Sequence, residues 1–262
     1  LTMNPPGPLA GKSIVVTRAR AQAGPLAAAI AAQGGEPLIF PLLEISPAAD
    51  AQPLVAVVAR LADYALAVFI SPNAVDYALP VILARGAWPA GLLPAAVGQG
   101  TVKALAAHGI AGCIAPSERF DSEALLALPE MVDERVAGRR IAIFRGDGGR
   151  ELLADTLRAR GAEVDCVTCY RRSGPADGVA PLLVAWRAGR LDALTVSSSE
   201  GLRYLVDLLD AEGRAFLQKT PVFVPHARIA ENARALGLSN IILTDAADAG
   251  IVAGLRAYNW PL

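Results

Sequence analysis

The chain has 262 residues and a mass of 27.1 kDa, with 24 lysines and arginines, 25 aspartates and glutamates, and 53 % apolar residues. At roughly 150 residues per domain, this length predicts one large domain or two ordinary ones, and the apolar content excludes a disordered chain. A formal net charge of −1 argues against a general nucleic-acid binder, which needs a broad basic surface, so any anionic ligand must be bound by local groups.

Short apolar runs alternate with helical patterns along the chain, which is typical of a parallel α/β sheet. The predicted strands are residues 13–17, 37–41, 66–70, 94–97 and 112–115 in the first half, and 140–144, 163–169, 192–196, 221–224 and 240–243 in the second. Apolar residues at 54, 57, 58 and 61, and again at 202, 205, 206 and 209, have the spacing of a helix with one buried face. Five strands per half predict two doubly wound sheets of flavodoxin-like or Rossmann-like dimensions.

An internal repeat relates the two halves. Residues 11–18 align with 138–145 at an offset of 127, and four further landmarks keep the offset within one residue: 33–34 with 160–161, 70–71 with 196–197, 97–98 with 224–225, and 105–109 with 233–237. Gly34, Gly109, Gly161 and Gly237 follow helical stretches, where a left-handed C-terminal cap favours glycine. The chain is therefore predicted to be a duplicated unit.

Several other classes of protein are disfavoured. No stretch reaches the roughly 18 to 20 uninterrupted apolar residues of a membrane-spanning helix. Residues 1–12 lack the basic-then-apolar pattern of a secretory signal, so we expect a cytoplasmic protein. Cys166 and Cys169 lie in a predicted strand on opposite faces, which favours buried thiols over a redox or metal pair. With only His108 and His226 in addition, we expect no metal site.

Polar residues follow the predicted strands directly, at the edge where parallel α/β sheets bind their ligands. They are Thr17-Arg18, Ser71-Pro72-Asn73, the run 98–101, Arg145-Gly146, Tyr170, the serines 197–199, and the run 225–228. Hydroxyls, arginines and helix N-termini all suit carboxylates or phosphates. A carboxylate pair, a Ser-His-Asp set and a metal-ligand cluster are missing, and residues 146–149 resemble a phosphate loop only loosely.

In order and spacing, these segments resemble the uroporphyrinogen-III synthase family over about residues 11–258. The motifs are Val16-Thr17-Arg18, the run 71–75, Val97-Gly98 with Thr101, Arg145-Gly146 with Gly149-Arg150, and Tyr170-Arg171-Arg172. The resemblance implies two α/β domains joined by a two-stranded crossover, with residues 1–41 and 174–262 in the first and 42–173 in the second. It also implies a lyase that cyclises a linear tetrapyrrole, hydroxymethylbilane, to uroporphyrinogen III with inversion of the last ring, without a cofactor.

The resemblance also implies roles for individual residues. Tyr170 matches the family tyrosine thought to assist departure of the substrate hydroxyl. The expected substrate-binding residues are Arg18, Ser71, Asn73, Thr101, Arg145, Gly146, Ser197, Ser198 and Arg228. The family often has threonine at position 228, some members have arginine at position 73, and glycine is commoner than Pro225.

Each of these residues also has a purely structural interpretation. Tyr170 can pack at a strand end with its hydroxyl at the surface, Ser71 and Ser197 can be plain helix N-caps, and Arg18 and Arg145 can be ordinary surface charges. A two-domain ligand-binding protein or a sensory domain would use the same fold without catalysis. We expect a monomer whose partner is the small tetrapyrrole, and neither nucleic acid nor membrane.

Overall fold

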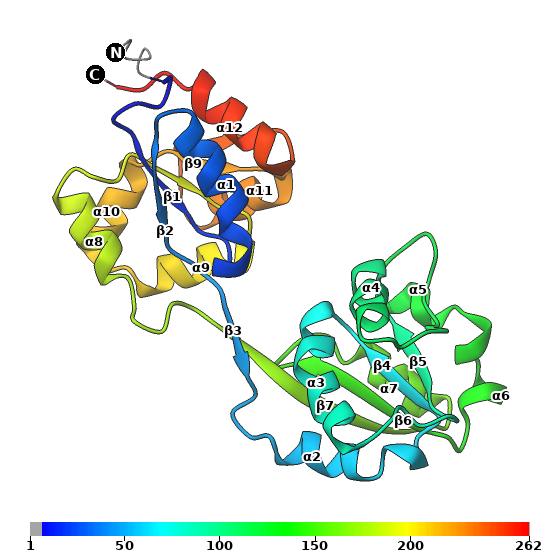
Figure 1. The fold of residues 1–262 in the computed structure, drawn as a ribbon. Helices are drawn as coiled ribbons and strands as arrows, with labels where there is room; N and C mark the ends of the chain where they lie inside the picture. Colours follow the sequence, from blue (N-terminus) through cyan, green and yellow to red (C-terminus); the bar gives the residue numbers. More distant parts are fainter. Residues whose placement is uncertain (1–6, 262) are drawn as a thin grey trace, which may run out of the picture. The chain divides into compact units, whose positions relative to one another are not determined.

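The computed structural model describes residues 7–261 and divides the chain into two compact units. Unit 1 consists of the chain up to Glu44 together with the chain from Ser173 onward, and unit 2 is the continuous segment Ile45–Arg172. Each unit is built on a five-stranded sheet (Figure 1). The predicted α/β class with two doubly wound sheets is confirmed.

The sheet of unit 1 has the strand order β10-β9-β8-β1-β2, and the registered pairs are parallel. Its strands are β1 (Ser13–Val16), β2 (Glu36–Ile39), β8 (Ala193–Thr195), β9 (Val222–Val224) and β10 (Ile241–Leu243). One core packs α1 (Arg20–Ala32) and α12 (Ala247–Ala257) against one face. A second core packs four helices against the other face: α8 (Ala180–Arg187), α9 (Ser199–Leu208), α10 (Ala211–Lys219) and α11 (Ala227–Ala235).

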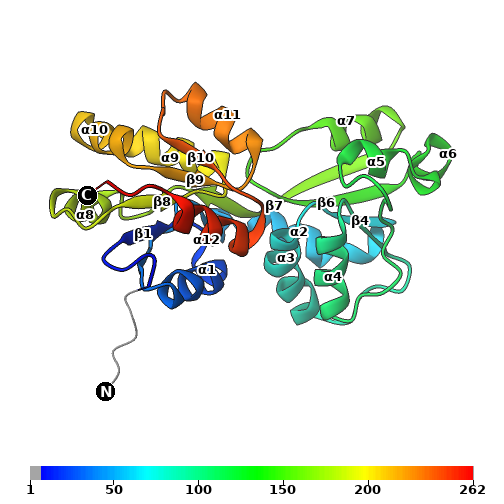
Figure 2. The ribbon, with the colours of Figure 1, turned by 90° about the horizontal axis from the view of Figure 1, so that it is seen from above.

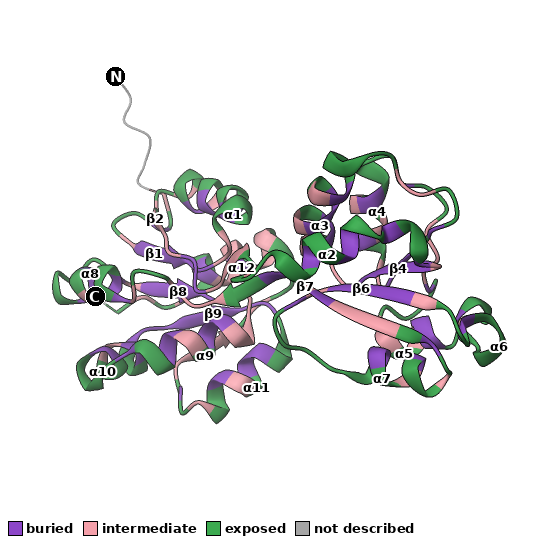
Figure 3. Ribbon diagram, turned by 90° about the horizontal axis from the view of Figure 1, so that it is seen from below, coloured by how far each residue is buried: buried purple, intermediate pink, exposed green. Residues whose placement is uncertain are grey.

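The sheet of unit 2 has the order β3-β7-β6-β4-β5. Its strands are β3 (Glu44–Pro47), β4 (Leu66–Phe69), β5 (Leu93–Ala96), β6 (Arg140–Gly146) and β7 (Glu163–Ser173). One face is covered by α2 (Gln52–Ala59), η1 (Leu61–Asp63), α3 (Pro72–Arg85) and α4 (Gln99–Ala107), and the other by α5 (Ser122–Leu126), η2 (Pro129–Met131), α6 (Asp133–Val136) and α7 (Leu152–Ala159) (Figure 2). The middle of β6 is buried between these two layers (Figure 3).

The internal repeat reappears in the way the strands pair. With the offset of about 127, β1, β2, β8 and β9 correspond to β6, β7, β4 and β5. Neighbours in one sheet correspond to neighbours in the other, because β9-β8-β1-β2 matches β5-β4-β6-β7. Each sequence repeat therefore supplies two strands of one sheet and three of the other. The four predicted glycine caps are confirmed, with φ angles of 85° at Gly34, 79° at Gly109, 85° at Gly161 and 88° at Gly237.

Two strands differ from the prediction. The expected strand over residues 112–115 is reduced to a single bridge between Ile114 and Ala95, so it is an edge fragment beside β5. The sequence analysis missed β3, a four-residue strand that lies at the edge of the sheet beside β7. β3 has only four residues, Glu44-Ile45-Ser46-Pro47, which are too few to predict a strand without its partner. That partner, β7, is longer than predicted because it extends to Ser173.

The three cysteines are free thiols. Cys166 packs against the α5–α7 side of the unit 2 sheet and Cys169 against the α2–α4 side, so the predicted opposite orientation is confirmed. Burial raises the pKa of Cys169 to about 12 and that of Cys113 to about 11, which keeps both thiols protonated at neutral pH. Across residues 7–261, none of the helices combines the length and apolar character needed to cross a membrane. Residues 1–6 of the segment searched for a secretory signal lie outside the described part.

Candidate active site

The strand ends of unit 1 form a pocket of about 460 Å³. It is lined by Ser197, Ser198, Ser199, Glu200, His226, Arg228 and Ile229, so the structure brings together three of the predicted binding residues. Ser198 is the N-cap of α9 and accepts a hydrogen bond from Gly201 N at 3.1 Å. The expected structural role of Ser197 as an N-cap is therefore wrong, because the neighbouring serine fills it.

The guanidinium of Arg228 and the imidazole of His226 in this pocket are exposed. Arg228 and His226 both lie at the start of α11, and within residues 7–261 neither side chain has a hydrogen-bond or ion-pair partner. Both are therefore available to an incoming anion. Arg18, at the end of β1, is different, because it forms an ion pair with Asp248 in the first turn of α12 and does not line the pocket.

In unit 2, Tyr170 is fully buried near the end of β7. Its hydroxyl lies 2.9 Å from Ser71 Oγ, and Arg172 Nη2 donates to it at 3.2 Å. The ring of Tyr77 stacks against that of Tyr170 with centroids 6.1 Å apart. The structural interpretation that placed the hydroxyl at the surface is therefore wrong, since the phenol is held inside a hydrogen-bonded group.

Gly146 allows this arrangement at the end of β6. A Cβ at Gly146 would lie 2.7 Å from two ring atoms of Tyr170, closer than real contacts allow, so no larger residue fits without moving the ring. The pairing of β6 with β7 shifts register between Arg145 and Gly146, and Asp147 N donates to Tyr170 O at 2.9 Å. Ser71 serves as the N-cap of α3, as its structural interpretation predicted, by accepting from Ala74 N at 3.2 Å.

Asn73 and Thr101 occupy the first turns of α3 and α4. These turns are neighbours, because a Cβ at Gly100 would lie 3.6 Å from Pro72 Cγ. In the described part of the chain, neither the Asn73 amide nor the Thr101 hydroxyl has a hydrogen-bond partner. Both groups can therefore bind a ligand.

Arg145 lies on the opposite face of this sheet from Tyr170, in a second pocket of about 180 Å³. The pocket is lined by Ile70, Val97, Ser122, Ile143, Arg145, Gly148, Gly149, Arg150, Leu153 and Ala154. Arg145 is tied to its own loop, with Nη1 2.8 Å from Glu151 Oε1 and Nη2 donating to Gly148 O at 3.0 Å. Burial opposes its charge, but the hydrogen bond and attraction to Glu151 outweigh burial and raise the pKa of Arg145. It is not an ordinary surface charge, since its side chain is only 11 % exposed.

Three residues around these sites were not among the site residues expected from the sequence. Tyr77 and Arg172 hold Tyr170, and Arg150 at the rim of the second pocket forms a two-pronged ion pair with Glu123. Sequence spacing gives no signal for Tyr77 or for the partner of Arg150, because those contacts join different elements. Arg172 lies two residues after Tyr170 in β7, so the period of a strand could have indicated that contact. Arg150 does occur in the motif that carries the family resemblance, yet its partner is 27 positions away.

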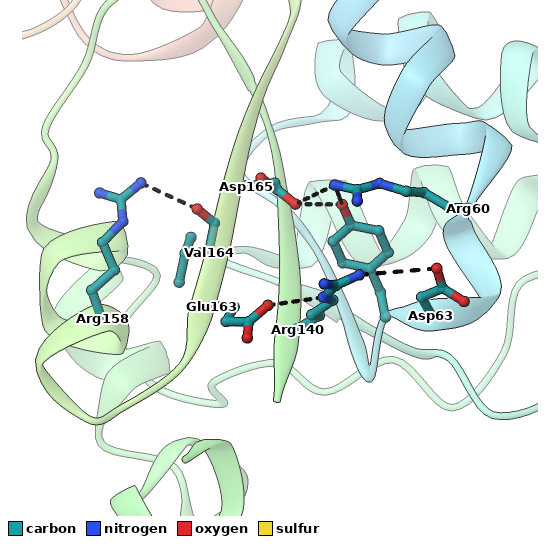
Figure 4. Close-up of polar contacts among 8 residues, drawn as sticks. Arg60, Asp63, Arg140, Arg158, Glu163, Val164 and Asp165 are labelled. Atoms are coloured by element: carbon teal, nitrogen blue, oxygen red, sulfur yellow. Dashed lines mark hydrogen bonds and ion pairs between the residues drawn. The ribbon is translucent and has the colours of Figure 1, made fainter. Parts of the chain in front are cut away.

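A separate polar cluster lies at the opposite, amino-terminal end of β6 and β7 (Figure 4). Arg140 contacts Glu163 at 2.8 Å and Asp63 at 4.0 Å, while Arg60 donates to Asp165 at 3.3 Å. Tyr64 donates to the same carboxylate, and burial followed by the interaction with Asp165 raises the pKa of Tyr64 to about 12. This cluster joins the end of η1 to the sheet, and it lies about 17 Å along β6 from the strand-end residues. Nowhere in residues 7–261 do three or more His, Cys, Asp or Glu residues gather as a metal site.

Comparisons with known proteins agree with these observations. A family model described as uroporphyrinogen-III synthase HemD matches residues 24–252. The chain is 35 % identical to the uroporphyrinogen-III synthase of Escherichia coli (strain K12) over 240 residues, which cover 90 % of this chain and 96 % of that protein. It is 34 % identical to that of Synechococcus elongatus over 207 residues, covering 77 % and 76 %. The crystal structure of a mutant uroporphyrinogen III synthase from the extremely thermophilic bacterium Thermus thermophilus shares the fold, with a TM-score of 0.63 at 18 % identity, covering 94 % of this chain and 98 % of that one.

Proposed function

The chain belongs to the uroporphyrinogen-III synthase family, a family of hydro-lyases in tetrapyrrole biosynthesis, and we propose that it closes hydroxymethylbilane to uroporphyrinogen III with inversion of the last ring. The substrate carries an acetate and a propionate on each of its four pyrroles. It needs donors for many carboxylates and one group that assists loss of the terminal hydroxyl. Strand-end residues of unit 1 offer donors for carboxylates, and those of unit 2 offer such donors together with the phenol of Tyr170.

The observation that carries this proposal is the position of the Tyr170 hydroxyl between Ser71 and Arg172. Because Arg172 donates to the phenol oxygen, the phenol proton points away from the guanidinium, and it can pass to Ser71 Oγ, 2.9 Å away, or to the hydroxyl of a bound substrate. Delivered to the departing hydroxyl, this proton would let the C–O bond break with loss of water. The pyrrole nitrogen would supply the electron pair and return its own N–H proton to the phenolate, which leaves a neutral azafulvene and restores the phenol. No strong base is required for this step, so a neutral phenol is sufficient.

The remaining residues bind and orient the chain of pyrroles. Among residues 7–261, the side chains of Asn73, Thr101 and Arg228 have no hydrogen-bond partner. Hydroxyls or backbone N–H groups near strand ends come from Ser197 and Ser198 in unit 1 and from Ser71 and Gly146 in unit 2. Arg18 and Arg145 are proposed to act through the strand-end loops that their ion pairs fix. Holding both ends of a reactive substrate favours ring inversion over spontaneous closure without inversion.

The test is to supply freshly made hydroxymethylbilane and identify the porphyrin isomer after oxidation. We expect isomer III at a rate above that of spontaneous closure. Formation of isomer I alone, at the uncatalysed rate, contradicts the proposal and supports a binding or sensory protein. We also propose that the enzyme acts as a monomer, and a sedimentation mass near 27.1 kDa with and without substrate would agree with that.

A further inference from the structure

The rim of the second pocket carries a charged pair that the proposed mechanism does not use. Arg150 Nη1 and Nη2 lie 2.6 and 3.0 Å from the two carboxylate oxygens of Glu123, so the two groups form a bidentate ion pair. Arg150 lines the pocket, and Glu123 follows Ser122, which also lines it. The carboxylate of Glu123 thus occupies the place that a ligand carboxylate would take on Arg150.

This pair is built differently from its neighbour in the same pocket. The side chains of Arg150 and Glu123 are 61 % and 43 % exposed, whereas that of Arg145 is 11 % exposed and also bonds to the backbone of its loop. Exposed ion pairs contribute little to stability because water and salt screen them, so exchanging one carboxylate for another on Arg150 costs little. Arg145 fixes the loop, and Arg150 is free to exchange its partner.

The interior of the pocket fits the rest of the same ligand. Its floor is apolar, made by Ile70, Val97, Ile143, Leu153 and Ala154, and its rim is polar. Its volume of about 180 Å³ is smaller than the roughly 300–1,000 Å³ that encloses a whole small ligand, so it suits one part of a larger molecule. A pyrrole arm, with apolar methylenes ending in a carboxylate, has this combination of surfaces.

We propose that Arg150 binds a carboxylate arm of the tetrapyrrole at this pocket and that Glu123 competes with that arm for the guanidinium. The proposal rests on the proposed function and adds a binding residue and a competitor to it. Glu123 is charged at neutral pH, because the hydrogen bond from Arg150 holds the pKa of its carboxyl below the usual value. Competition is therefore present under the conditions of the reaction.

The two partners are expected to move substrate binding in opposite directions. Arg150→Ala removes the receptor and raises the KM for hydroxymethylbilane about tenfold, while Glu123→Gln removes the competing charge and lowers it about threefold. The Kd for uroporphyrin III, an octacarboxylate probe followed by its fluorescence, should likewise rise in Arg150→Ala and fall in Glu123→Gln. The Tm changes little in both variants, because the pair is exposed.

A matched control exists in unit 1. Arg187 Nε lies 3.1 Å from Glu212 Oε1, and its Nη2 bonds the other carboxylate oxygen, so this pair has the same two-pronged form. It joins the end of α8 to the first turn of α10 and lines neither pocket. Arg187→Ala and Glu212→Gln should leave KM and probe binding unchanged.

A purely structural ion pair would respond differently. It would move KM in the same direction for Arg150→Ala and Glu123→Gln, or leave both at the wild-type value, and either result overturns the proposal. Failure of the proposed function is recognised separately, because the wild-type protein would then form no isomer III. If the wild type forms isomer III and the two variants do not diverge, only the role of Arg150 is lost.

Discussion

The two units share a strand order and differ in what their strand ends offer. In unit 1, Arg228 and His226 are exposed and have no partner among residues 7–261, beside a pocket of about 460 Å³. In unit 2, Arg145 and Arg150 are each paired with a glutamate, and Tyr170 is buried in a hydrogen-bonded group. The two units thus share a backbone arrangement. Unit 1 exposes an arginine and an imidazole at its strand ends, whereas unit 2 holds a buried phenol in a fixed position.

The largest expected effect on this contrast between the units comes from removing the hydroxyl of Tyr170 alone. Tyr170→Phe keeps the ring that packs against Tyr77, so we expect the fold to persist with a loss of about 1 kcal/mol in unfolding free energy. The kcat should fall about 100-fold with little change in KM, because only donation to the leaving hydroxyl is lost. Steady-state kinetics and denaturant unfolding measure both. Wild-type kcat in a folded variant would assign Tyr170 to packing.

A second change tests why unit 2 needs a glycine next to its tyrosine. With the offset of 127, Gly146 corresponds to Ala19 in unit 1. Gly146→Ala places a Cβ 2.7 Å from the Tyr170 ring, and we expect a loss of about 1–3 kcal/mol together with reduced kcat. Gly24→Ala in α1 is the control, since nothing lies within 4 Å of the added Cβ and the helix favours alanine. Equal stability of the two variants would show that the ring tolerates the contact.

Two arginines of unit 1 are expected to differ in their roles, with Arg228 affecting substrate binding and Arg18 affecting stability. Arg228→Ala is expected to raise KM about fivefold without changing the Tm, because the exposed guanidinium has no partner in the described structure. Arg18→Ala is expected to cost about 1 kcal/mol of unfolding free energy, because it leaves the partly buried Asp248 unpaired. Kinetics and thermal unfolding of both variants measure the contrast. A lower Tm for Arg228→Ala would place that residue in the fold instead.

The smallest expected effect lies at the amino-terminal end of the unit 2 sheet. The pKa of Tyr64 is raised from 10.0 to about 12 in the folded protein, so the folded state holds this proton more tightly than the unfolded state. The associated stability is complete below pH 10 and is lost as the pH rises through 10 toward 12. Tyr64→Phe should flatten this part of the stability profile, measured by denaturant unfolding between pH 8 and 11. An unchanged slope would contradict the assigned pKa.

Much of the fold could be predicted from sequence because buried parallel strands are apolar runs between glycine-capped helices. Glycines after helical stretches predicted the four caps, but the repeat could not show that each of its copies contributes strands to both sheets. The short β3 escaped detection because its pairing with β7 is tertiary. Within the candidate site, residues next to strands could be found by position. The partner of Arg150 is Glu123, 27 positions away, and spacing does not encode that contact. Arg172 is two residues from Tyr170 in the same strand, so its contact could have been predicted.

Because each repeat contributes strands to both sheets, the two units are completed at different times during synthesis. All five strands of unit 2 have been made once the ribosome has added Ser173, whereas β1 pairs with β8, which begins only at Ala193. Translation adds about 5–20 residues per second, so the first two strands of unit 1 wait about 8–30 seconds for their central neighbour. We expect unit 2 to become protease-resistant on the ribosome first, while the N-terminal strands depend on a chaperone or on their own solubility until the last third of the chain emerges.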